Sequence, residues 1–267
     1  MITATSNPRV KQVVLWQTKA RERKEAGIFL VEGFKMFEEA PAEWIQEVYV
    51  STDALDKVKE NQNYIDIKEK LDQVGYEEVS AEVLRKMSDT QTPQGILCVV
   101  KRPSYKIEEL IAVENPMLVV LENLQDPGNV GTIVRTGEGA GVTGVILSEG
   151  SVDIYNPKTI RATMGSIYRV PIVYAEDLIK VTEEMRLQGI KSYAAHLSGE
   201  KYYDHFDFQK GCAFLIGNEG NGLTQGLAEA ADEYLKIPME GQVESLNAAI
   251  ATSLLMYEAH RQRQMGE

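Results

Sequence analysis

The sequence predicts an α/β protein in two parts, a smaller α/β/α unit followed by a larger domain with a mainly parallel sheet. Short apolar runs alternate with amphipathic stretches, and strands that alternate with helices form parallel sheets covered on both faces. Polar, Gly-rich segments directly follow three of the later apolar runs, where open α/β sheets place their ligand sites. The length of 267 residues suits one large domain or two smaller ones.

The smaller unit is predicted over residues 1–102. Val10, Val13 and Val14 recur at helical spacing among cations, which indicates a helix over 10–24 that Gly27 ends. The turn at Arg102-Pro103-Ser104 and the polar residues after it indicate a linker over 103–116 before the larger domain, 117–267. The other predicted elements are strands over 28–31, 45–50, 76–79 and 95–101 and helices over 34–40 and 53–60.

The larger domain alternates more regularly. Strands are predicted over 117–122, 144–148, 170–174, 191–196, 212–216 and 234–237, and helices over 129–140, 157–167, 176–188, 222–230 and 245–263. The sequence from Gly139 to Gly144 matches the dinucleotide-binding pattern G-x-G-x-x-G, but a true fingerprint follows a strand and opens a helix. These glycines instead close a helix, so they predict a C-cap and argue against a nucleotide-dependent enzyme of Rossmann type.

Composition limits the functional classes. A hydrophobic content of 43% and a charged content of 25% are typical of a soluble globular protein, and no apolar run is long enough to cross a bilayer. The N-terminus lacks the apolar stretch of a signal peptide, and Cys98 and Cys212 fall in strand-like runs as expected of buried thiols, so a cytoplasmic location is expected. Two cysteines and three histidines give no metal-ligand spacing, so no metal and no membrane are expected.

The charge distribution bears on the partner. The net charge of -12 argues against a nucleic-acid ligand, because phosphate contacts need Lys and Arg. The first 24 residues are nevertheless locally basic, although a solvated helix face explains such a run equally well by itself. The candidate RNA-binding cations are Arg9, Lys11, Arg21 and Arg23.

Three polar, Gly-rich segments carry the functional signal, and we call them the first, second and third segments. The first, Asn123–Arg135, begins where the strand over 117–122 ends. Asp126-Pro127-Gly128 predicts a turn, Asn129 is predicted to cap the next helix, and Arg135 falls inside that helix. Alone, this segment is best explained as a capped connecting helix with one surface Arg.

The other two segments also follow strands. The second, Leu215–Leu223, contains three glycines interleaved with Asn and Glu, which permits close approach of the backbone to a ligand. The third, Ile237–Asn247, leads into a helix with Ser245 as its predicted cap and Asn247 in its first turn. An ordinary strand-to-helix turn explains each one separately, but their order and shared position at strand ends indicate a single binding site.

Taken in order, the three segments resemble the motifs of the SpoU, or TrmH-like, family of RNA ribose 2′-O-methyltransferases, within the SPOUT superfamily. The resemblance covers about residues 113–263, and Phe29-Leu-Val-Glu-Gly33 resembles the RNA-binding domain of the rRNA-acting members. It implies a C-terminal segment threaded into a deep trefoil knot, an exception to the usual unknotted rule. It also implies that S-adenosylmethionine binds in the knot and that a homodimer completes a composite active site, with helices 129–140 and 245–257 at the interface.

The resemblance assigns roles to single residues. The catalytic set is Asn129, Arg135, Glu219, Ser245 and Asn247, and the cofactor set is Leu197, Gly217, Glu219, Ile237, Met239, Leu246 and Asn247. A neutral Arg is a poor base because its pKa exceeds ~12, so Arg135 is expected to stabilise the alkoxide that develops on the ribose. The expected substrate is 23S rRNA, since the long N-terminal unit is typical of rRNA-acting members. A tRNA 2′-O-methyltransferase and a non-catalytic RNA-binding protein of the same fold are the alternatives.

Overall fold

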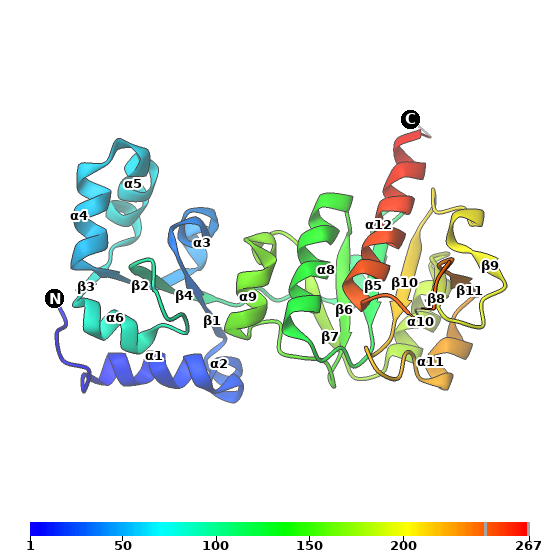
Figure 1. The fold of residues 1–267 in the computed structure, drawn as a ribbon, viewed down its shortest axis with the longest axis horizontal. Coiled ribbons are helices and arrows are strands. Elements are labelled where there is room, and N and C mark those ends of the chain that lie inside the picture. Colours follow the sequence, from blue (N-terminus) through cyan, green and yellow to red (C-terminus); the bar gives the residue numbers. More distant parts are fainter. Residues whose placement is uncertain (243–244, 266–267) are drawn as a thin grey trace. The chain divides into compact units, whose positions relative to one another are not determined.

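The computed structural model describes residues 1–242 and 245–265 and divides the chain into two compact units (Figure 1). Unit 1 comprises Met1–Pro103 together with Asp153–Tyr168, and unit 2 comprises Ser104–Val152 and Arg169–Glu267. The segment Asp153–Tyr168 therefore packs with the N-terminal part of the chain, although the sequence places it between two strands of the larger domain.

Unit 1 is built on a four-stranded mixed sheet in the order β1-β4-β2-β3. Strands β1 (Ile28–Glu32) and β2 (Ile45–Ser51) run antiparallel to β4 (Ile96–Lys101), and β2 runs parallel to β3 (Glu77–Val79). The helices of this unit are α1 (Pro8–Thr18), α2 (Ala20–Ala26), α3 (Phe34–Glu39), α4 (Thr52–Glu60), α5 (Ile65–Val74), α6 (Ala81–Met87) and α9 (Pro157–Thr163), with 3-10 turns η1 (Ala42–Trp44), η2 (Gln62–Tyr64) and η3 (Ser166–Tyr168). Figure 1 shows α1 and α6 on one face of the sheet and α3, α4 and α5 on the other, which confirms the predicted α/β/α layers.

The helix predicted over 10–24 is in fact two helices. The backbone leaves helical geometry at Lys19, with φ -121° and ψ 108°, between α1 and α2. The break has a local cause, because the Arg23 guanidinium folds back and its Nη1 donates to the carbonyls of Trp16 and Gln17 at 2.7 and 3.2 Å. The side chain thus satisfies two of the last carbonyls of α1. Gly27 ends α2 with φ 64°, as predicted.

Unit 2 is built on a seven-stranded sheet in the order β7-β6-β5-β10-β8-β11-β9, and its neighbouring strands are all parallel. The strands are β5 (Met117–Leu121), β6 (Gly144–Ser148), β7 (Ile172–Ala175), β8 (Lys191–Ala195), β9 (Lys201–Tyr202), β10 (Cys212–Ile216) and β11 (Glu233–Lys236). The predicted parallel sheet is confirmed, while the short edge strand β9 was not predicted. Strands β5 and β10 are buried along their whole length because helices cover both faces of the sheet.

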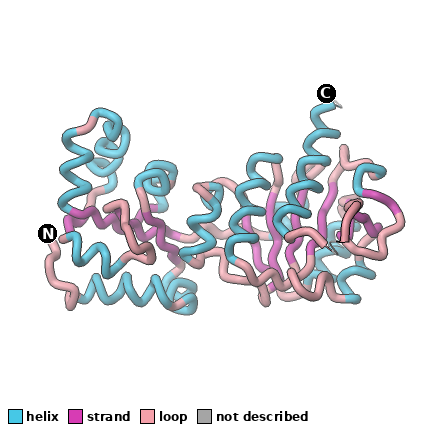
Figure 2. Tube along the Cα trace, in the orientation of Figure 1, coloured by secondary structure: helices cyan, strands magenta, loops and turns pink. Residues whose placement is uncertain are grey.

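Helices cover this sheet from both sides (Figure 2). Helices α8 (Pro127–Ala140) and α12 (Ala248–Met265) pack side by side on one face. On the other face α7 (Ile107–Ile111), α10 (Leu178–Leu187) and α11 (Gln225–Ala230) share one core with strand residues, and a further 3-10 turn, η4, spans Tyr203–His205.

Two details of unit 2 bear on the sequence-based predictions. Helix α7 lies inside the stretch expected to be a linker, and it buries Leu110 and Ile111 in the core of unit 2. Gly141 ends α8 with φ 78°, and Gly144 opens β6, so the G-x-G-x-x-G match is a helix C-cap as predicted. The trefoil knot stays a prediction.

Candidate functional site

The three Gly-rich segments meet at one edge of the unit 2 sheet. Strands β5, β10 and β11 belong to one parallel sheet, so their carboxyl ends point the same way. The first segment follows β5, the second follows β10 and the third follows β11. Within the third segment, Val243 and Glu244 lie outside the described residues.

Glu219 ties the second segment to the first. Its Oε1 accepts hydrogen bonds from the Asp126 amide and from Asn129 Nδ2, each at 3.1 Å, and its Oε2 accepts one from the Gln125 amide at 3.2 Å. Partial burial disfavours the charged carboxylate, but these hydrogen bonds outweigh it and hold the pKa of Glu219 below its ordinary value. Glu219 is therefore an anion at neutral pH that the first segment fixes in place.

Asn129 continues this network to the third segment. While its amide nitrogen donates to Glu219, its Oδ1 accepts a hydrogen bond from Asn247 Nδ2 at 2.9 Å. One carboxylate and two amides thus connect all three segments, and each of these residues was predicted to belong to the site. We call the hydrogen-bonded set Glu219, Asn129 and Asn247 the polar triad.

The helix caps at this site differ from the predicted ones. Asp126, not Asn129, caps α8, because its Oδ1 accepts from the amides of Gly128 and Asn129. Pro127 occupies the first helical position, so the helix begins at Pro127 and not at Asn129. At α12 the cap is Asn247, whose Oδ1 accepts from two amides of the first turn, and the predicted cap Ser245 lies exposed before the helix. The caps assigned to Asn129 and Ser245 were therefore wrong.

The second segment forms a closed loop. Asn218 and Gly222 exchange two backbone hydrogen bonds of 3.0 and 2.9 Å, and Asn218 Nδ2 donates to the carbonyl of Asn123 at 2.8 Å. Gly217 has no room for a side chain, because a Cβ there would lie 2.0 Å from the carbonyl carbon of Gly222. A glycine is thus required at position 217, where the two ends of the loop touch, and the predicted approach of this backbone to a ligand stays a prediction.

A cavity of about 670 Å³ opens beside this loop. Its volume falls in the usual range of small-molecule and cofactor sites. Residues of the second and third segments and of the loop after β8 line it, whereas no described residue of the first segment does. The lining includes every predicted cofactor residue, namely Leu197, Gly217, Glu219, Ile237, Met239, Leu246 and Asn247, and it also includes Ser245.

Arg135 stands apart from this cavity. Its side chain is exposed on α8, and it is not among the described residues that line the cavity. One turn further along α8, a Cβ on Gly139 would lie 3.0 Å from the hydroxyl of Tyr257 on α12. Residues four apart share a helix face, so Arg135 lies on the side of α8 that adjoins α12.

The cations predicted to bind RNA differ in their surroundings. Lys11 is exposed, Arg9 pairs with Glu77 at 3.2 Å, and Arg21 pairs with Glu25 at 2.7 Å. Arg23 is only 2% exposed, and its Nη2 donates to Asp153 Oδ2 at 2.6 Å. The structure removes Arg23 from this set, because a buried, paired guanidinium cannot reach a phosphate.

Sequence reasoning missed two residues at the site. Glu122, directly after β5, accepts hydrogen bonds from the backbone amide and from the hydroxyl of Thr224, which ends the second segment. The available signal was an acidic residue at the end of an apolar strand, where a buried carboxylate needs a partner. That partner lies 102 positions away in the sequence, so no local pattern identifies it.

Membrane-spanning helices and metal sites are both features that the described residues would reveal. None of the described helices is both long and apolar enough to cross a bilayer. Within residues 1–242 and 245–265, no group of three or more His, Cys, Asp or Glu side chains is placed to hold a metal ion.

Two family models match the chain. Residues 116–257 match the SpoU rRNA Methylase family, and residues 7–98 match the MRM3-like substrate binding domain. The first match contains the three segments, and the second covers most of the N-terminal part of unit 1.

Similar proteins match over nearly the whole length. The 23S rRNA (guanosine(2553)-2′-O)-methyltransferase RlmP of Bacillus subtilis is 32% identical over 96% of this chain and 97% of its own. The AdoMet-bound rRNA methyltransferase of Sinorhizobium meliloti has a TM-score of 0.84 and 31% identity, and it covers 97% of both chains. The SpoU methyltransferase AviRb of Streptomyces viridochromogenes, in complex with AdoMet, has a TM-score of 0.85 and 27% identity over 98% of this chain and all of its own (100%).

Proposed function

The chain belongs to the SpoU rRNA Methylase family, and from that premise we propose that it methylates a ribose 2′-hydroxyl of 23S rRNA with S-adenosylmethionine. The single observation that carries the proposal is the polar triad, which joins the three family segments beside the cavity. The family is one of RNA methyltransferases, and the target, the roles of single residues and the assembly are parts of the proposal.

The cavity fits S-adenosylmethionine in size and in chemistry. Apolar side chains such as Leu197, Ile237 and Leu246 offer surface to a flat base, and the backbone of the glycine loop offers donors and acceptors. The anionic Glu219 favours a ligand with positive charge. When bound, this cofactor supplies an electrophilic methyl group on a sulfonium.

Arg135 is the residue that we assign to the ribose. A guanidinium offers five donors and no acceptor, so we assign Arg135 to the stabilisation of negative charge and not to the role of base. Held near the 2′-oxygen, it stabilises the alkoxide that forms as the hydroxyl proton passes to solvent water, which makes this oxygen the better nucleophile. Asn129 and Asn247 fix the first and third segments against each other, so that ribose and cofactor are held in one geometry.

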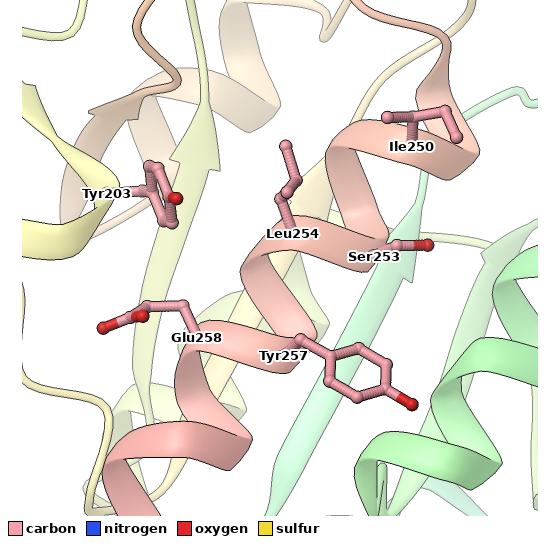
Figure 3. A pocket seen from close by; sticks show the side chains of 6 residues that line it. All are labelled: Tyr203, Ile250, Ser253, Leu254, Tyr257 and Glu258. Atoms are coloured by element: carbon pink, nitrogen blue, oxygen red, sulfur yellow. The ribbon is translucent and has the colours of Figure 1, made fainter.

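A second copy of the chain brings Arg135 to a cavity in this proposal. The exposed face of α12 carries the large apolar residues Ile250, Leu254 and Tyr257, which are 51%, 39% and 48% exposed. Together with Tyr203 they line a shallow hollow of about 390 Å³, and Tyr257 extends toward α8 (Figure 3). Contiguous exposed apolar residues of this kind mark protein–protein contacts, and a two-fold dimer pairs one such face with itself.

Mixing two inactive variants tests the composite site. Arg135→Ala retains a complete cavity, and Asn247→Ala retains Arg135. If each site takes Arg135 from the partner, a mixture should regain about a quarter of the wild-type activity, because half of the dimers are mixed and each holds one intact site. A mixture that stays inactive, although mass spectrometry detects mixed dimers, would rule out the composite site.

The RNA target rests on the N-terminal unit and on the relatives. RlmP, named for 23S rRNA, aligns with both units of this chain. We propose Arg9, Lys11 and Arg21 as phosphate contacts, since surface pairs with Glu exchange readily for phosphate. The proposed location is the cytoplasm, where the free thiols Cys98 and Cys212 stay reduced.

Labelled S-adenosylmethionine separates the candidate functions. Purified protein is incubated with 23S rRNA, or with tRNA, prepared from cells that lack it, and incorporation of tritium is measured. Transfer to 23S rRNA supports the proposal, and transfer to tRNA alone would replace its target. RNA binding without any transfer to either RNA would favour the non-catalytic alternative.

A further inference from the structure

One buried carboxylate beside the site has no role in the mechanism above. Glu122 is 8% exposed and directly follows β5. Its Oε2 accepts a hydrogen bond from the Thr224 amide and its Oε1 accepts one from the Thr224 hydroxyl, both at 2.7 Å. Burial of a carboxylate is costly unless hydrogen bonds compensate it, so this bidentate contact needs an explanation.

The contact closes one end of the glycine loop. Thr224 is the last residue of the loop and also the N-cap of α11, where its Oγ1 accepts from the Leu227 amide at 3.3 Å. The other end of the loop begins at Asn218, which donates to the carbonyl of Asn123. Two consecutive residues at the end of β5, Glu122 and Asn123, therefore hold both ends of the loop.

The backbone between these two ends forms one wall of the cavity. Residues 217–223 all line it, whereas Glu122 is not among the described residues that do. The Glu122 side chain therefore acts on the cavity wall through its contact with Thr224 and does not itself line the cavity. If that contact is lost, the loop keeps its internal hydrogen bonds and its anchor at Asn218 but loses the anchor at its Thr224 end.

We propose that Glu122 is a positioning residue that holds the glycine loop, through Thr224, in the conformation that binds S-adenosylmethionine. The inference rests on the proposed function, because it assigns Glu122 to the cofactor site of the same enzyme. It also assigns a direction, since the affinity for the cofactor depends on Glu122, while the affinity for RNA and the chemical step do not.

The substitution Glu122→Gln tests this directly. Gln matches Glu in shape, but its amide nitrogen cannot accept a hydrogen bond from Thr224, and one charge-assisted bond is lost. We expect the Kd and the KM for S-adenosylmethionine to rise about tenfold, with kcat at saturating cofactor and the KM for RNA within about twofold of wild type. A merely structural defect would instead lower kcat through loss of folded enzyme and leave the KM for the cofactor unchanged.

Variants at Thr224 test whether the two residues act as a unit. Thr224→Val removes the hydroxyl and should raise the Kd about tenfold, whereas Thr224→Ser keeps the hydroxyl and should bind within about twofold of wild type. In the double variant with Glu122→Gln, the losses should not add, since both single changes break the same contact. Glu176→Gln, which changes an exposed carboxylate at the start of α10, is the matched control and should leave the Kd unchanged.

The outcomes separate this inference from the proposed function. If wild-type protein binds no S-adenosylmethionine in calorimetry, the proposed function fails and the role of Glu122 fails with it. If wild type binds and Glu122→Gln binds within twofold of it, only the role of Glu122 is overturned. Additive losses in the double variant, or a fall in kcat at constant KM for the cofactor, would overturn it as well.

Discussion

Replacement of the buried Arg23 by Met should destabilise unit 1 specifically. The guanidinium donates to Asp153 at 2.6 Å and to the carbonyls of Trp16 and Gln17, and its side chain is 3% exposed. Asp153 belongs by sequence to the stretch that matches the methylase family, so this pair joins segments 130 positions apart. The substitution keeps most of the side-chain volume and removes only the charge and the donors.

The expected loss follows from the burial of the pair. Removal of one partner of a buried ion pair costs about 3–5 kcal/mol, because it leaves the other charge without compensation. The Asp153 side chain is 24% exposed and Arg102 Nη2 remains 3.6 Å from its Oδ1, so water and Arg102 compensate part of its charge and the lower end of that range applies, about 3 kcal/mol. A loss of this size lowers the melting temperature of a small domain by roughly 12 °C or more.

The two tryptophans of the chain make the assay specific. Trp16 and Trp44 both belong to unit 1, so their fluorescence in urea reports the unfolding of that unit. Arg21→Met is the matched control, since its side chain is 83% exposed and its ion pair within the described part of the chain is the surface pair with Glu25, so its effect should stay below about 0.5 kcal/mol. Asp153→Asn should lower the same transition as Arg23→Met. A loss below 1 kcal/mol for Arg23→Met would refute the account of a buried structural pair.

Three further outcomes are expected. Arg263→Met should lower the free energy of unfolding by about 2–4 kcal/mol, because the Arg263 guanidinium donates to four backbone carbonyls, those of Asn115, Pro116, Phe208 and Lys210. Replacement of the exposed Arg261 by Met should leave the melting temperature unchanged, and equal effects of the two variants would contradict this. Leu254→Asp places a charge on the apolar face of α12, so it should yield monomers in sedimentation and abolish methyl transfer. The control Leu187→Asp changes a side chain that is 84% exposed on α10 and should leave the dimer intact. A stable Leu254→Asp dimer would count against the α12 interface. The pKa of Glu219 is lower in the folded than in the unfolded chain, so its charge stabilises the fold fully above about pH 4.3, and this stabilisation is lost as the pH falls through the folded pKa. The difference in unfolding free energy between wild type and Glu219→Gln should therefore shrink between pH 6 and 3. A difference that stays constant over this range would contradict the prediction.

Patterns of neighbouring residues predicted much of the fold. Strands β5, β6 and β10 of the parallel sheet follow directly from apolar runs, because a strand buried on both faces is apolar nearly throughout. Helix starts were less accurate where two capping residues compete, as at Asp126 and Asn129. Asp126 prevails because the following Pro127 fits the first helical position and has no amide to leave unpaired.

Long-range contacts explain what the sequence did not reveal. The segment Asp153–Tyr168 packs with unit 1 through an aromatic cluster, in which the ring of Phe29 lies 5.1 Å from that of Tyr155 and 6.1 Å from that of Tyr168. None of these contacts leaves a local period in the sequence. Arg23 was predicted to bind RNA for a related reason, because an Arg among other cations on a short helix is usually exposed.

The functional site shows the same contrast between local patterns, which the sequence reveals, and long-range contacts, which it does not. The position of the three segments at strand ends predicted that they would lie close together. They do so because β5, β10 and β11 belong to one parallel sheet, whose carboxyl ends share one edge. Their hydrogen-bond partners could not be predicted in the same way. Glu219 and Asn129 are 90 positions apart, and only the order of the strands decides that they meet.

The most direct test of the central claim is a map of 2′-O-methylated nucleotides in 23S rRNA. Methylated positions resist alkaline hydrolysis, and they can be compared among cells that carry wild-type protein, Arg135→Ala or no protein. The proposal predicts one position that is protected with wild type and unprotected in the other two. Identical patterns in all three, together with no transfer from labelled S-adenosylmethionine in vitro, would contradict it.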